Sequence, residues 1–87
     1  MNVMLRKAMV IARTDDTTTV RVEGTVNSKP FAASITINEG SPEFGWYDAT
    51  KPTEDVDEEA EIIHAIDSAL LAKYPMLVER EMRRIGG

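Results

Sequence analysis

The sequence predicts an α+β fold, an antiparallel meander of three to four strands followed by two C-terminal helices packed on one face. Two observations predict it. Through the first half of the chain, apolar and polar residues alternate and short turn sequences interrupt them. From residue 54 the apolar spacing changes to three and four residues, as in amphipathic helices. The 87 residues therefore form a single domain, with a β meander in 1–47 and a helical part in 54–85.

Three strands are expected at residues 3–13, 18–26 and 31–37, with turns at 14–17 and 27–30. Tight turns between consecutive strands predict antiparallel pairing. The strand at 18–26 alternates strictly and should be half-buried. The strand at 3–13 has apolar residues on both faces, which predicts an interior position in the sheet. Its expected faces are Val3, Leu5, Met9 and Ile11 against Ala8, Val10 and Ala12.

Residues 43–47 predict a short fourth strand, with Phe44 and Trp46 on one side and Tyr47 on the other. Two interpretations of these aromatic residues stay open. Trp46 can close the core where the sheet meets a helix. Alternatively, an exposed Trp46–Tyr47 pair beside acidic residues would be an anchor of the kind that dominates protein interfaces.

The first helix is expected to be capped by Thr53 or Asp55 and to end near Tyr74, and the Asp55-x-x-Glu58 spacing fits a capping pair. Carboxylates in its first turn are favourable beside the positive end of the helix dipole. Its apolar residues predict the face that covers the sheet. They are Val56, Ala60, Ile63, Ile66 and Leu70, widened by Ile62 and Ala69.

Pro75 can close that helix or open the next one, since proline is tolerated at a first helical position. Residues 76–85 predict a second helix, with Glu79 four residues before Arg83. A glycine after basic residues is a usual helix end, so we expect this helix to stop at Gly86.

Composition excludes many chemistries. The chain has no cysteine, so disulfides, thiolate metal sites and thiol nucleophiles are ruled out. The sequence has no phosphate-binding glycine loop, and no serine lies in the glycine-flanked nucleophile elbow of serine hydrolases. The one histidine, His64, belongs to a single Glu-x-x-His motif with Glu61, whereas di-iron sites need two such motifs. We expect a non-enzymatic protein without catalytic residues, metal ligands or cofactor. The apolar stretch at residues 8–12 is shorter than a secretory or membrane segment, so we expect a cytoplasmic protein that contacts no membrane.

The charge distribution is the most informative feature of the sequence. The net charge of −5 opposes direct binding to nucleic acid. Residues 39–67 hold ten carboxylates and one lysine, a net −9, whereas residues 1–38 and 68–87 are each +2. A solvated helix start explains part of this block. The alternative is an acidic surface that docks a basic, nucleic-acid-binding protein partner. The residues expected to bind that partner are Glu23, Lys29, Trp46, Tyr47, Glu54, Asp55, Glu58 and Glu59.

The second and third predicted strands resemble the central hairpin of small phage anti-CRISPR proteins that block type I surveillance complexes. The resemblance lies in Arg21-Val22-Glu23, Val26-Asn27, Lys29 and Ala33, and the order of a sheet followed by two helices ending in the Arg83-Arg84 pair is similar too. It implies an antiparallel sheet followed by two helices, and an inhibitor from a phage or mobile element. It also implies that Glu23 contacts the nucleic-acid-binding Cas subunits from the face of the sheet.

Two other functions stay open. The end of the chain, Met-Arg-Arg-Ile-Gly-Gly, resembles the tail of ubiquitin-like modifiers and sulfur carriers, which implies conjugation through Gly86 and Gly87. Capping of the second helix explains the same glycines. The protein could also be a small structural or accessory subunit of a virion.

Overall fold

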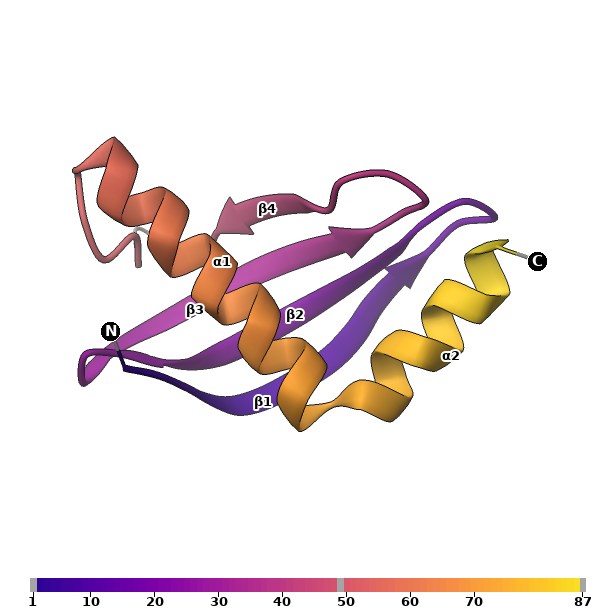
Figure 1. The fold of residues 1–87 in the computed structure, drawn as a ribbon, viewed down its shortest axis with the longest axis horizontal. Coiled ribbons are helices and arrows are strands. Elements are labelled where there is room, and N and C mark those ends of the chain that lie inside the picture. The colour runs from indigo at the N-terminus through magenta and orange to yellow at the C-terminus, as the bar shows by residue number, and fades with distance from the viewer. Residues whose placement is uncertain (1, 49, 87) are drawn as a thin grey trace.

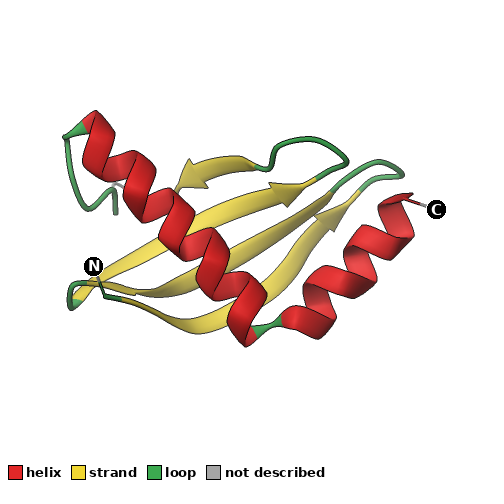
Figure 2. Cartoon of the chain, viewed as in Figure 1, coloured by secondary structure: helices red, strands yellow, loops and turns green. Residues whose placement is uncertain are grey.

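The computed structural model describes residues 2–48 and 50–86 and has two layers, a sheet and a pair of helices (Figure 1). The sheet contains β1 (Val3–Arg13), β2 (Thr18–Val26), β3 (Lys29–Ile37) and β4 (Glu43–Trp46). They lie in the order β1-β2-β3-β4, each antiparallel to its neighbour. Helices α1 (Val56–Lys73) and α2 (Pro75–Gly86) follow and lie on the same face of the sheet (Figure 2). The predicted α+β meander is confirmed, including its fourth strand.

β1 is an edge strand, so the predicted interior position is wrong. Its pairing with β2 shifts between Leu5 and Lys7 and again between Val10 and Ala12. Each shift inserts one residue and reverses the alternation of side chains. The apolar residues of β1 are divided between the core side and solvent, and Met4, Met9 and Ile11 are exposed. The predicted grouping of Met9 and Ile11 on one face with Val3 and Leu5 is therefore wrong. The β1 residues opposite buried positions of β2 are Val3, Leu5, Ala8, Val10 and Arg13.

Gly24 allows β1 to approach β2 at the first of these shifts. A Cβ on Gly24 would lie 2.0 Å from the carbonyl oxygen of Met4 and 3.0 Å from the Cα of Leu5. Both contacts are with backbone, which cannot turn away as a side chain can. β2 ends two residues beyond Gly24, and Asn27 and Ser28, with φ values of 50° and 72°, form the turn into β3. This is the left-handed geometry of a tight two-residue hairpin.

The core lies between the sheet and α1, and Ile62, Ile66 and Leu70 supply the buried residues of that helix. For two of the apolar residues expected on the sheet-covering face of this helix, the prediction is wrong. Val56 is 78% exposed, and Ala60 is exposed as well. α1 crosses the sheet diagonally and its first turns extend past the end of β4, so no strand lies beneath these residues (Figure 1).

α2 begins at Pro75 directly after Tyr74, whose backbone N–H donates to the Leu70 carbonyl and closes α1. Leu77, Val78 and Ile85 pack against the core. Gly86 is the last residue of α2 rather than the residue that follows it. In the described part of the chain, neither helix is long and apolar enough to cross a bilayer.

Candidate interaction surfaces

Two of the acidic residues singled out at the start of α1 hold the helix in place. The Asp55 carboxylate accepts hydrogen bonds from the backbone N–H groups of Asp57 and Glu58, at 2.9 and 3.1 Å, and is the N-cap. Glu59 forms an ion pair with Lys51 at 2.8 Å, and this hydrogen bond raises the pKa of the Lys51 ammonium. Asp55 and Glu59 therefore have local structural roles.

The neighbouring carboxylates are different. The side chains of Glu54, Asp57, Glu58 and Glu61 make no hydrogen bond or ion pair with any residue of 2–48 and 50–86, and all four residues are exposed. Spacings of three and four residues put Asp57, Glu58 and Glu61 on adjoining helix positions. The exposed Val56 lies in the same turn. We call Glu54, Val56, Asp57, Glu58 and Glu61 the acidic end.

Glu23 lies on the outer face of the sheet, the face without helices. Its carboxylate pairs with Arg6 at 2.9 Å and with Arg21 at 3.3 Å. Partial burial favours a higher pKa for the Glu23 carboxyl, but the hydrogen bonds from the two arginines outweigh it. The net effect is a pKa below the usual value. The Arg21 guanidinium also lies 4.5 Å from the centre of the Tyr47 ring. This part of the face is therefore a compensated charge network rather than an acidic patch.

Trp46 and Tyr47 do not form one anchor. Trp46 pairs with Ala33 and faces the helices, where its ring packs edge-on against Phe31 and Phe44, with ring centroids 6.1 and 4.7 Å away. Tyr47 is on the outer face, so a single flat partner surface cannot contact both residues. The Trp46 Nε1–H is buried and has no hydrogen-bond acceptor among the described residues.

The remaining candidates are scattered. Lys29 is exposed and opens β3 beside the hairpin turn. Gly86 is exposed at the end of α2, and Gly87 lies outside the described residues. His64 is exposed on α1, and no three residues of the types that bind metals gather within residues 2–48 and 50–86. Conjugation through the glycine pair stays a prediction.

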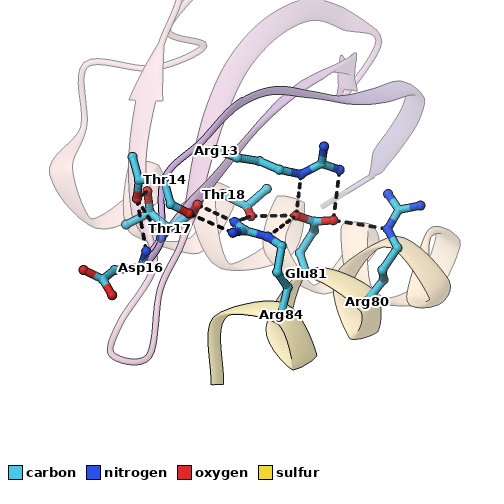
Figure 3. A network of polar contacts seen from close by, with 8 residues as sticks. All are labelled: Arg13, Thr14, Asp16, Thr17, Thr18, Arg80, Glu81 and Arg84. Carbon is cyan, nitrogen blue, oxygen red and sulfur yellow. Dashed lines mark hydrogen bonds and ion pairs between the residues drawn. The ribbon is translucent and has the colours of Figure 1, made fainter. Parts of the chain in front are cut away.

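Glu81, a buried carboxylate at the other end of the molecule, is not among the site residues predicted from the sequence. Glu81 of α2 is 1% exposed and accepts two hydrogen bonds from Arg13, at 2.9 and 3.1 Å (Figure 3). Thr18 donates at 2.7 Å, and Arg80 and Arg84 donate at 3.1 and 3.3 Å. These hydrogen bonds, that of Arg13 first, outweigh burial and hold the pKa of Glu81 far below its usual range. The network attaches α2 to β1 and β2.

Arg84 extends this network to the turn between β1 and β2. It donates to the carbonyl oxygens of Thr14 and Thr17, at 2.8 and 2.7 Å, and to the Thr18 hydroxyl at 2.6 Å (Figure 3). The sequence contained a signal for Glu81, which falls between Val78 and Ile85 at helical spacing and so on the apolar side of α2. The arginines near the C-terminus are thus partly neutralised, and the acidic end keeps its unbalanced charge.

Comparison of the chain with protein-family models, with curated proteins and with solved structures finds no match.

Proposed function

We propose that this protein is a non-enzymatic interaction module that binds a basic, nucleic-acid-binding protein through its acidic end. The observation that carries the proposal is the group of four exposed carboxylates without partners among the described residues, in the segment that also holds the exposed Val56. Capping and the Lys51 pair account for Asp55 and Glu59, but neither accounts for the other four. Exposed carboxylates that lack partners in the described part of the chain are suited to a surface of lysines and arginines.

The mode of action that follows is competition. A cluster of carboxylates on a rigid helix can occupy the cationic groove in which a partner holds nucleic acid, because both present negative charge at short spacing. The finer form of the proposal is inhibition of a type I surveillance complex, which rests on the resemblance of the β2–β3 hairpin to anti-CRISPR proteins. In that form Glu23 would add a contact from the outer face.

The test compares two variants with the same change in charge. Glu58→Lys/Glu61→Lys alters the acidic end, whereas Asp15→Lys/Asp16→Lys alters an exposed turn at the opposite end of the sheet. Both leave the Asp55 cap and the Glu59–Lys51 pair intact. Each is titrated into a purified type I surveillance complex, and binding of target DNA is measured.

We expect the wild type and the Asp15/Asp16 variant to block DNA binding, and the Glu58/Glu61 variant to be weaker by at least about tenfold. Equal inhibition by both variants would refute the role of the acidic end. Absence of inhibition by the wild type would refute the finer form. Binding of the wild type to immobilised basic nucleic-acid-binding proteins, compared with both variants, then tests the general form.

A further inference from the structure

A groove lies between the two helices and the loop that joins β3 to β4. Its volume is about 190 Å³. Its lining combines Ile37 and Pro42 from the sheet side, Leu70 and Leu71 from α1, and Val78 and Met82 from α2. Leu71 and Met82 are 49% and 44% exposed, so two large apolar side chains from different helices reach solvent at this place.

One hydrogen bond within the loop supports the wall that the loop forms. The Asn38 side-chain oxygen accepts a hydrogen bond from the Gly40 N–H at 2.8 Å, and both residues line the groove. The groove is smaller than the roughly 300–1,000 Å³ of pockets that hold metabolites or drugs. It is instead the size of one or two apolar side chains, such as those that anchor an amphipathic helix in a groove.

The charges around the groove indicate which charged residues its occupant should carry beside the apolar anchor. Asp67 is the one ionisable residue of its lining, and Glu39 and Glu43 flank lining residues of the loop and are exposed. Each of three other hollows in the described part of the chain contains a cation in its lining, namely Arg6, Lys73 or the Arg80–Arg83 pair. An apolar anchor with lysines or arginines beside it therefore fits the groove, whose lining contains a carboxylate and no cation.

We propose that this groove binds a short amphipathic segment of a partner, whose apolar side chains enter between Leu71 and Met82 and whose basic residues face Asp67, Glu39 and Glu43. The groove is separate from the acidic end and does not depend on it. A partner that engages both surfaces would gain affinity from two linked contacts.

The test uses a labelled synthetic helix with leucines at positions i, i+3, i+4 and i+7 and lysines elsewhere, titrated against the full chain by fluorescence anisotropy. Leu71→Ser/Met82→Ser removes the apolar walls. Met4→Ser/Met76→Ser is the matched control, because these residues are also exposed, at 63% and 77%, but do not line the groove. We expect the first variant to weaken binding by about tenfold and the control to change it less than twofold.

Four further measurements make the assignment specific. Asp67→Asn should weaken the lysine peptide, and a peptide with glutamates in place of lysines should not bind. The ¹³C-methyl signal of Met82 should shift on titration while that of Met76 stays in place. Glu58→Lys/Glu61→Lys should leave the shift of the Met82 methyl signal at saturating peptide unchanged, which separates this test from that of the acidic end.

Equal affinity of the two serine variants would overturn the proposal, as would a shift of Met76 in place of Met82. Sedimentation of the free protein tests a second copy of the chain as the occupant. A dimer that Leu71→Ser/Met82→Ser dissociates would overturn the proposal in favour of self-association, and a monomer supports it.

Discussion

Replacing Glu81 by glutamine keeps the size of the side chain but removes the charge on which the contact between α2 and the sheet depends. In the wild type, the carboxylate receives five hydrogen bonds from four residues while it is 1% exposed. Glutamine offers one acceptor oxygen, and its amide hydrogens would point toward guanidinium donors. The variant should therefore fold with a weakened attachment of α2.

The size of the effect follows from burial. Breaking a buried ion pair costs about 3–5 kcal/mol. Here the arginines can turn toward water, because the side chains of Arg13, Arg80 and Arg84 are 48%, 65% and 34% exposed. The low end of the range applies, so we expect a loss of about 3 kcal/mol in the free energy of unfolding. For a domain of this size, that is a fall in Tm of about 12–24 °C.

Urea denaturation followed by circular dichroism and by the fluorescence of Trp46 measures the loss. Glu79→Gln is the control, since Glu79 lies on the same helix but pairs with Arg83 at the surface, with a side chain 60% exposed. Its substitution should cost less than about 0.5 kcal/mol. A loss at Glu81 below about 1 kcal/mol, or equal losses at both positions, would show that the network does not attach α2 as described.

Two other outcomes follow from the same structure. The hydrogen bonds that lower the pKa of Glu81 in the folded state stabilise it fully above its ordinary pKa of 4.5, and this stability is lost as the pH falls below that value. The difference in unfolding free energy between wild type and Glu81→Gln should thus shrink by about 2 kcal/mol between about pH 6 and about pH 3, and a constant difference would contradict the assignment. Gly24→Ala should lower the free energy of unfolding by about 3 kcal/mol or more, because the new Cβ would lie 2.0 Å from the backbone of β1. Gly45→Ala is the control and should lower it by less than about 1 kcal/mol, because its Cβ meets only the Ser34 hydroxyl oxygen, at 3.3 Å. Similar urea midpoints for the two alanine variants would argue against the close approach of β1 to Gly24.

The order of the elements was predictable because it depends on local patterns. Alternation, turn residues and helical spacing are properties of neighbouring residues, and they gave the bounds of β1 and β2 and the alternative cap Asp55. The position of β1 in the sheet was not predictable in this way. A bulge changes which residues face the core without any change in composition, and the exposed Met4, Met9 and Ile11 gave β1 the apolar pattern of an interior strand.

The candidate site was likewise predictable only where it depends on local sequence. The excess of carboxylates at the start of α1 could be read from the sequence, but which of them are used locally depends on contacts with Lys51 and with backbone N–H groups. Glu81 pairs with Arg13 across 68 positions of the chain. Such a contact depends on how α2 lies against β1, which no local pattern specifies.

The bulges of β1 also restrict how the protein can meet another chain. An open sheet edge is a template for a further strand, but the two register shifts divide the eleven residues of β1 into short runs whose N–H and C=O groups are out of step with a regular partner. The opposite edge, β4, is only four residues long. Extension of the sheet by a second copy or by a peptide strand is therefore disfavoured at both sides. A partner has to be recognised by side chains, and each contact residue can then be altered singly without disturbing the backbone.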